Sequence, residues 1–251
     1  MSEPAALSVR GLFKSFGALP VTRGVNLELL PGARVGLIGP NGAGKTTLIH
    51  LLSGVLKADA GQIQLSGISV ERWPAERRVR HGLARTHQIN TLLGETCALD
   101  NVAIAIAERE RIAWRTVLYR RRWQACREEA RARLDEIGIG SAAQQPVREL
   151  AYGEQRLLEI AIALALRPRV LLLDEPAAGV PSGEVSVIHE ALARLPAEMA
   201  ILLIEHDMDL VFRFATEIVV LVQGSVLSQG SPEQTRADPR VRAAYLGRSL
   251  A

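Results

Sequence analysis

Short aliphatic runs alternate with segments of helical spacing along most of this chain. Parallel strands need a crossover connection, usually a helix, so the alternation predicts a largely parallel β-sheet covered by helices, which is an α/β fold. One aliphatic run leads directly into a glycine-rich loop, and another leads into two acidic residues. We expect the loop and the acids to lie at the carboxyl ends of neighbouring strands. The expected strand and helix pairs are 34–38 with 45–53, 170–173 with 184–195, and 201–204 with 208–214.

Two regions interrupt this alternation. Residues 7–29 form two runs punctuated by Gly17 and Pro20, a pattern typical of antiparallel strands joined by a turn. From about Ile89 to Leu166 strand signals disappear, and apolar residues recur at helical spacing. We expect an N-terminal antiparallel β layer and an inserted α-helical subdomain within a single domain. The expected boundaries are 1–88 and 167–251 for the core with its β layer, and 89–166 for the helical subdomain.

The composition narrows the class of protein. The chain has 251 residues, 48% of them hydrophobic, as in a globular protein. Its two cysteines, Cys97 and Cys126, lack metal-ligand spacing, so neither a disulfide framework nor a zinc site is indicated. No stretch approaches the roughly 20 apolar residues that cross a bilayer, and the N-terminus lacks a signal-peptide pattern. We expect a reducing cytoplasm and, at most, a peripheral role at a membrane.

Charge is placed unevenly, although the net charge is only +3. Between Arg109 and Arg133 there are nine arginines and only three acidic residues. Charge runs usually face water, and a solvated helix face is the simplest interpretation. Contact with anionic headgroups or with a membrane partner is the alternative.

The segment GPNGAGKTT fits the pattern GxxxxGK[ST] between an expected strand and an expected helix. Small residues let the backbone curl so that consecutive N–H groups point at phosphate oxygens, and the helix N-terminus adds about half a positive charge. Lys45 supplies a full charge, and the Thr46 hydroxyl supplies a ligand for Mg²⁺. The segment therefore predicts binding of a nucleoside triphosphate. The residues expected to bind it are Gly39, Pro40, Asn41, Gly42, Ala43, Gly44, Lys45, Thr46 and Thr47.

Two adjacent acids, Asp174 and Glu175, end an apolar run. Side chains alternate along a strand, so the two carboxylates point different ways and can have different roles. We expect Asp174 to position Mg²⁺ and Glu175 to polarise the attacking water as a general base. His206 follows the expected strand 201–204, which places it at the same edge, where it could bond the γ-phosphate. The sequence lacks an Asn-Lys-x-Asp motif, which GTPases use to recognise guanine, and this favours ATP over GTP as the bound nucleotide.

At this point the sequence, from about Leu7 to Gly247, resembles the ATP-binding subunits of ABC transporters. The resemblance implies a P-loop NTPase core of RecA-like type, in which Phe16 stacks on adenine and Gln88 of the Q-loop contacts Mg²⁺ and the catalytic water. His206 matches the switch histidine. The segment LAYGEQRLLEIA resembles the signature that contacts ATP bound to a second subunit. Its contact residues would be Ala151, Tyr152, Gly153, Glu154 and Gln155.

Three positions depart from the family pattern. Ala151 stands where a signature serine would contact the γ-phosphate of the opposite subunit, and the site should work with one contact fewer. Pro181 replaces the aspartate expected in the dimer-contact loop. His87 stands where the most similar branch has phenylalanine.

That branch consists of importers for branched-chain amino acids and related amides and urea, which DEPAAG, LLIEHDM and DPRVRAAYLG resemble. The resemblance implies an ATPase on the cytoplasmic face of the plasma membrane. Its expected partners are a second ATPase subunit, identical or paralogous, the transmembrane permease and, indirectly, a solute-binding protein. An ATPase of an exporter or lipid-transport system, or a soluble ABC ATPase, remains an alternative. With one cassette and no sustained heptads, we expect no nucleic-acid partner.

Overall fold

The structure is a computed structural model that describes residues 4–86, 92–112, 119–181 and 183–246. The chain divides into two compact units. The first contains Met1–Arg85, Arg169–Glu175 and Pro196–Ala251, and the second contains Thr86–Pro168 and Pro176–Leu195. The segment after Glu175 is thus grouped with the helical residues, whereas the sequence placed it in the core. The boundaries 1–88, 89–166 and 167–251 stay a prediction.

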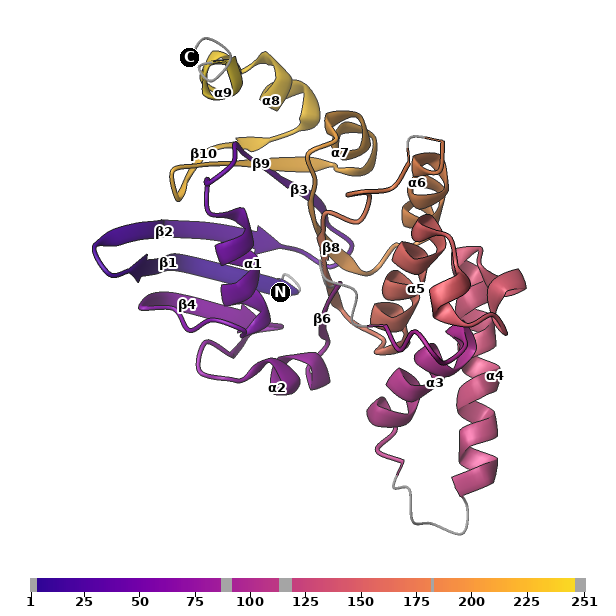
Figure 1. Cartoon of the computed structure of the whole chain (residues 1–251). Coiled ribbons are helices and arrows are strands. Elements are labelled where there is room, and N and C mark those ends of the chain that lie inside the picture. The colour runs from indigo at the N-terminus through magenta and orange to yellow at the C-terminus, as the bar shows by residue number, and fades with distance from the viewer. Residues whose placement is uncertain (1–3, 87–91, 113–118, 182, 247–251) are drawn as a thin grey trace. The chain divides into compact units, whose positions relative to one another are not determined.

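The first unit contains a six-stranded sheet in the order β10-β9-β3-β8-β7-β6 (Figure 1). Its strands pair in parallel except for β10, which is antiparallel to β9. This arrangement confirms the predicted α/β class. Because β8 lies between β3 and β7, the expectation that the glycine loop and the acids follow neighbouring strands is wrong. The strands are β3 Arg34–Ile38, β6 Leu83–Arg85, β7 Val170–Asp174, β8 Ala200–Ile204, β9 Glu217–Val222 and β10 Ser225–Gly230.

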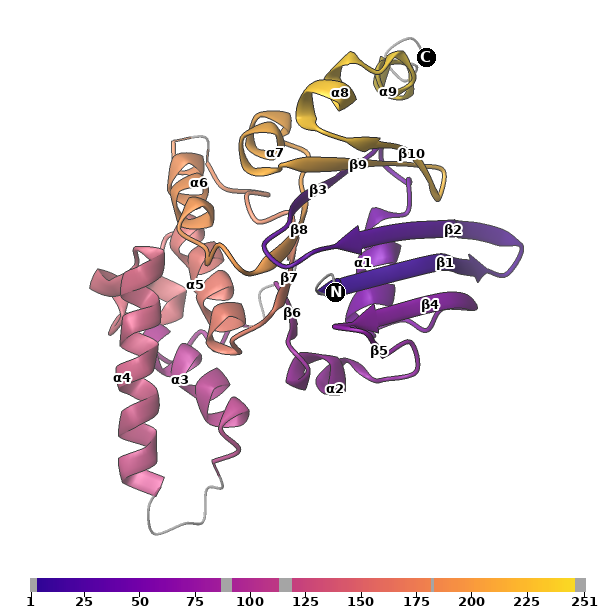
Figure 2. The ribbon, with the colours of Figure 1, turned by 180° about the vertical axis from the view of Figure 1, so that it is seen from behind.

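A second sheet, in the order β2-β1-β4-β5, forms the predicted antiparallel layer (Figure 2). The predicted pair is present, although β2 already begins at Leu19, so Pro20 lies in the strand and not in the turn. Strands β4 and β5 were not predicted from the sequence. Helix α1, Lys45–Ser53, buries its apolar side in one hydrophobic cluster with residues of both sheets. The strands are β1 Leu7–Phe16, β2 Leu19–Leu29, β4 Ala60–Leu65 and β5 Ile68–Ser69.

Strand β9 shows how the six-stranded sheet buries both faces. Val219 and Leu221 join the cluster around α1, whereas Ile218 and Val220 join a second cluster. This alternation follows from the period of two along a strand. The second cluster also contains residues of α7, Met208–Phe214, and of α9, Pro239–Leu246. Helix α8, Pro232–Ala237, precedes α9.

Arg78 belongs to helix α2, Ala75–Arg80, and its side chain binds the C-terminal end of α1. Its guanidinium is 1% exposed and donates to the carbonyls of Leu51 and Leu52 at 2.6 and 2.7 Å, and to those of Trp73 and Glu71 at 3.1 and 3.2 Å. Burial lowers the pKa of Arg78 to about 10, and Glu71 opposes that shift. The guanidinium thus donates to carbonyls in the last turn of α1, one of which, that of Leu51, also accepts from the N–H of Gly54 at 3.3 Å.

We expect Arg78→Met to lower the free energy of unfolding by about 2–4 kcal/mol, because buried carbonyls lose a charged donor. Urea denaturation followed by circular dichroism measures the change. Arg72→Met, the same substitution at an exposed position of the same region, is the control and should change stability by less than about 0.5 kcal/mol. Equal losses in the two variants would contradict this role for Arg78.

The second unit is helical. Helices α3, α4 and α5 pack on one another, and α6 packs on α5. On α4, Cys126, Ala130, Leu134 and Ile137 are buried, which confirms the predicted helical spacing. The helices are α3 Ala98–Arg109, α4 Tyr119–Ile137, α5 Tyr152–Ala165 and α6 Val185–Ala193.

The arginines of the basic segment divide into two groups. Arg109 binds Glu129 at 2.7 Å, and Arg127 binds Asp100 at 2.7 Å. These two arginines therefore form ion pairs within the helical subdomain. Arg133 lies farther from Glu129, at 4.0 Å. Residues 120–122 are exposed, and within the described part of the chain they have no ion-pair partner. Among the described residues, none of the helices combines the length and the apolarity needed to span a bilayer.

Candidate functional site

The glycine loop joins β3 to α1 in the first unit, as predicted. Gly44 has φ 102°, and a Cβ there would lie 2.6 Å from the carbonyl oxygen of Val21, so only glycine fits. Gly42 also has positive φ, 77°. Among the residues that the structure describes, no side chain caps the start of α1. Its first N–H groups are therefore open to an anion, the arrangement that binds phosphate at helix N-termini.

Lys45 lies inside this loop. Its Nζ donates to the carbonyl oxygens of Gly39 at 2.6 Å and Pro40 at 3.3 Å, and the residue is 7% exposed. Burial lowers the pKa of Lys45, while the nearby Glu175 and Asp174 act in the opposite direction. The ammonium is therefore held within the loop by weak neutral acceptors, which phosphate oxygens could replace.

Glu175 and His206 meet at the carboxyl edge of the sheet. The Nε2 of His206 lies 2.9 Å from Oε1 of Glu175. Glu175 has φ +50°, an uncommon conformation for a residue other than glycine, and its N–H donates to the carbonyl of Ile204 at 2.9 Å. The kinked backbone turns this carboxylate away from the strand and toward the histidine. A carboxylate bonded to an imidazole can accept a proton from water.

Asp174 has a different partner, as the alternation along β7 predicts. Its Oδ2 accepts from Nη2 of Arg85 at 2.8 Å, and the two side chains are 1% and 9% exposed. Sequence reasoning missed Arg85 and also Glu205, a residue 4% exposed whose carboxylate accepts from the N–H of His206 at 2.9 Å. A charged residue at the end of a short apolar strand was the available signal in both cases.

The oxygen ligands predicted for Mg²⁺ suit that ion. Thr46 offers a hydroxyl in the first turn of α1, and Asp174 offers a carboxylate at the end of β7. Within the described ranges, no group of three or more His, Cys, Asp or Glu side chains is placed to hold a metal. A hydroxyl and a carboxylate are oxygen ligands of the kind that Mg²⁺ takes together with several waters and substrate phosphates. Gln88, the third predicted ligand, lies outside the described residues.

The signature segment opens helix α5 in the second unit. The helix starts at Tyr152. The Oε2 of Glu154 accepts from the N–H of Ala151 at 3.0 Å, but the alanine methyl cannot return a bond. The N–H of Gly153 donates to Oε2 of Glu184 at 3.3 Å. This helix N-terminus therefore holds a carboxylate, as expected for a site that accepts anions.

Tyr152 links the signature segment to the loop that follows Glu175. Its hydroxyl donates to the carbonyl of Ala178 at 3.2 Å and accepts from Nη2 of Arg156 at 2.8 Å. A Cβ on Gly179, which has φ +77°, would lie 3.0–3.3 Å from the tyrosine ring and hydroxyl, so the ring packs closely on that glycine. Tyr152 thus orders the loop within this unit.

Known proteins resemble the chain over nearly its full length. A family profile described as ABC transporter matches residues 22–178, more than half of the chain. The high-affinity branched-chain amino acid transport ATP-binding protein BraF of Pseudomonas aeruginosa is 40% identical over 98% of this chain and 99% of its own. The chain belongs to the ABC transporter family. It is an ATP-binding protein of that family, whose members are ATPases.

Further comparisons agree with this ABC family assignment. The corresponding protein LivG of Escherichia coli is 41% identical over 98% of this chain and 99% of its own. A profile described as branched-chain amino acid ATP-binding cassette transporter matches residues 225–251. The ADP conformation of MJ1267, an ATP-binding cassette of an ABC transporter, has a TM-score of 0.83 at 27% identity, covering 97% of this chain and 99% of that one.

The other residues singled out by the ABC resemblance lie in different surroundings. Phe16 is 49% exposed at the end of β1, so it is not a core aromatic, and the ammonium of Lys14 lies 5.7 Å from its ring centre. Pro181 is exposed in the loop after Glu175. His87 lies outside the described residues. The adenine contact of Phe16 stays a prediction.

We expect Ala151→Ser to raise the free energy of unfolding by about 1 kcal/mol, because serine at the start of α5 can accept from the N–H of Glu154 and complete a capping box. Thermal and urea unfolding measure the gain. Ala132→Ser, at an exposed interior position of α4, is the control and should not stabilise the chain. A loss of stability in Ala151→Ser would show that this backbone does not accept the cap.

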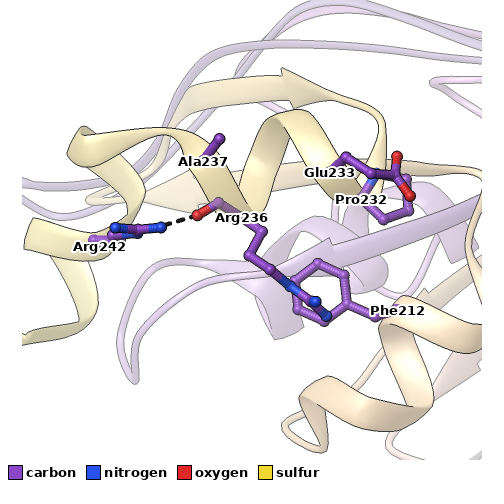
Figure 3. A pocket seen from close by; sticks show the side chains of 6 residues that line it. All are labelled: Phe212, Pro232, Glu233, Arg236, Ala237 and Arg242. Atoms are coloured by element: carbon purple, nitrogen blue, oxygen red, sulfur yellow. Dashed lines mark hydrogen bonds between the residues drawn. The ribbon is translucent and has the colours of Figure 1, made fainter.

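A cavity of about 290 Å³ lies among α7, α8 and α9 of this ABC ATPase (Figure 3). The guanidinium of Arg236 stacks 4.4 Å from the ring centre of Phe212, and Nε of Arg242 donates to the carbonyl of Arg236 at 3.1 Å. Glu233 adds a negative charge to the lining. These contacts fasten the C-terminal helices to α7 in the region of the second family profile.

Proposed function

We propose that this chain is the ATP-hydrolysing subunit of a membrane importer for branched-chain amino acids or related amides. The observation that carries hydrolysis is the pairing of Glu175 with His206 at 2.9 Å, in the unit that holds the phosphate loop. The solute class is supported by the full-length similarity to BraF and LivG, both named as branched-chain amino acid transport proteins.

In the proposed reaction, the N–H groups of the loop and the ammonium of Lys45 bind the β- and γ-phosphates of ATP. Glu175 accepts a proton from the water that attacks the γ-phosphorus, and His206 holds the carboxylate in place and bonds the γ-phosphate. Mg²⁺, held by Thr46, Asp174 and Gln88, would neutralise charge on the phosphates. Because the donors are already in position, electrostatic stabilisation supplies most of the rate enhancement.

A second subunit, identical or paralogous, would complete each site. In this arrangement the start of α5, from Ala151 to Gln155, faces the ATP of the opposite subunit, and two such contacts clamp two ATP molecules. The carboxylate of Glu184 at Gly153 supports an anion site there, since a γ-phosphate offers the same kind of oxygen acceptor. Closure would push on a permease through the surface around 88–101, and hydrolysis would release it. We place this assembly at the cytoplasmic face of the plasma membrane.

Transport measured with the native complex tests this function. Affinity-tagged chain should co-purify with hydrophobic permease subunits, and the reconstituted complex should take up radiolabelled leucine only with ATP on the side of this chain and binding protein on the other. Complex carrying Lys45→Ala is the matched control and should not transport. Isolation without membrane subunits would favour the soluble ABC ATPase, and ATP-driven movement toward the opposite side would favour the exporter.

A further inference from the structure

The six-stranded sheet places Arg85 beside Asp174, the acid that is expected to position Mg²⁺. It is the last residue of β6 and pairs with Leu172 of β7 in parallel register. Asp174 lies two residues further along β7, on the same face as Leu172, because side chains alternate with a period of two. A long side chain on Arg85 therefore reaches forward to this carboxylate, which accounts for the 2.8 Å bond between Nη2 and Oδ2.

Stability alone does not explain this pair. Buried ion pairs contribute little net stability compared with apolar residues of similar size. Arg85 is moreover poorly satisfied: within the described part of the chain, its buried Nε has no hydrogen-bond partner. A buried donor without a partner costs about 1–3 kcal/mol. An apolar residue at this strand end would fold as well, so the guanidinium is better explained by what it does to Asp174.

The bond from Arg85 fixes the position of one carboxylate oxygen of Asp174, Oδ2. Lys45 and His50 also carry electrostatic interactions with Asp174, and Arg85 bonds it in an ion pair of 2.8 Å. Partners that hydrogen-bond a metal-binding carboxylate fix its orientation, and their loss typically costs about 10–100-fold in metal affinity.

We propose that Arg85 is a positioning residue for Mg²⁺: it holds the Asp174 carboxylate in the orientation that receives the water shell of the ion. This inference rests on the proposed function. It adds a residue that belongs to neither the phosphate loop nor the acid pair. It also places a determinant of the magnesium site three residues before Gln88, at the start of the Q-loop segment.

The test measures the magnesium advantage, defined as the ATP dissociation constant in EDTA divided by that in excess Mg²⁺. Isothermal titration of the full chain gives both constants. Arg85→Met should lower the advantage at least tenfold while leaving ATP affinity in EDTA within about threefold of the parent chain. Arg85→Lys should retain most of the advantage, because one charged donor suffices where only one bond is made. The ratio is taken within each variant, so a general loss of stability cancels.

Arg34→Met is the matched control. Arg34 starts β3, at the end of the strand opposite the phosphate loop, and bonds the carbonyls of Met199 and Pro196 at 2.6 and 2.7 Å. This variant should keep the full magnesium advantage. Should Arg85→Met fail to fold, Arg85→Gln, which also lacks the charge, takes its place with the same expected loss.

The possible results distinguish failure of the role of Arg85 from failure of the proposed function. An unchanged magnesium advantage in Arg85→Met overturns the role of Arg85, and an increased advantage overturns it as well, since it would show that Arg85 competes with the ion. In both cases the parent chain still binds Mg²⁺ and ATP, so the proposed function stands. Absence of ATP binding in the parent chain would instead remove the proposed function.

Discussion

Lys45→Ala is expected to weaken ATP binding by about 100-fold or more, which corresponds to roughly 2.7 kcal/mol. The ammonium is buried within the loop on the carbonyls of Gly39 and Pro40, and ATP would replace these neutral acceptors with charged phosphate oxygens. Hydrogen bonds between charged groups are about twice as strong as neutral ones. Removal of the only full positive charge of the loop therefore removes its strongest contacts.

Isothermal titration with ATP in excess Mg²⁺ checks this result. Lys57→Ala, which removes an exposed lysine shortly after α1, is the control and should bind ATP as the parent chain does. Lys45→Ala should remain folded, because within the described part of the chain the lysine bonds two carbonyls of its own loop. Undiminished ATP affinity in that variant would refute the assignment of this loop as the phosphate site.

Helices and strands whose ends are marked by glycines or capping residues were predictable from the sequence. Predicted bounds for β3, α1 and α7 agree with the structure residue by residue. Helix α1 lies between Gly44 and Gly54, both in the left-handed conformation, and Asp207 caps α7 through its side chain. Local chemistry determines such ends, so one sequence is enough. By contrast, α6 begins at Val185, where no side chain of the described part of the chain caps it, and its predicted bounds were too long at both ends.

Features that depend on distant parts of the chain could not be predicted in this way. The insertion of β8 between β3 and β7 is a matter of sheet order, which hydrophobic periodicity does not encode. Arg85 is a similar case. Its role depends on the register of β6 against β7, and β6 has only three residues, too few to show a period. The nucleotide-binding loop could be predicted because its residues are contiguous, whereas the partner of Asp174 comes from a strand 89 residues away in sequence.

Glu175→Gln is expected to lower ATP turnover at least tenfold, equivalent to about 1.4 kcal/mol in the barrier, while ATP binding is kept. The glutamine amide has nearly the shape of the carboxylate and can still bond His206, so the geometry at 2.9 Å is retained. It cannot accept a proton from the attacking water at neutral pH. The loss should therefore appear in kcat and not in the dissociation constant of ATP, as for a group that acts only in the transition state.

Phosphate release under saturating Mg²⁺ and ATP measures this turnover, and titration of the same sample measures binding. Glu190→Gln, the same substitution on the exposed side of α6, is the control and should keep full turnover. Glu205→Gln gives a sharper comparison, because the carboxylate of Glu205 accepts from the backbone N–H of His206 and an amide oxygen can accept that bond equally well. Turnover should thus fall strongly at position 175 and weakly at position 205. Unchanged turnover in Glu175→Gln would exclude it as the base, and an equal fall in both variants would mean that negative charge near His206, and not proton transfer by Glu175, sets the rate.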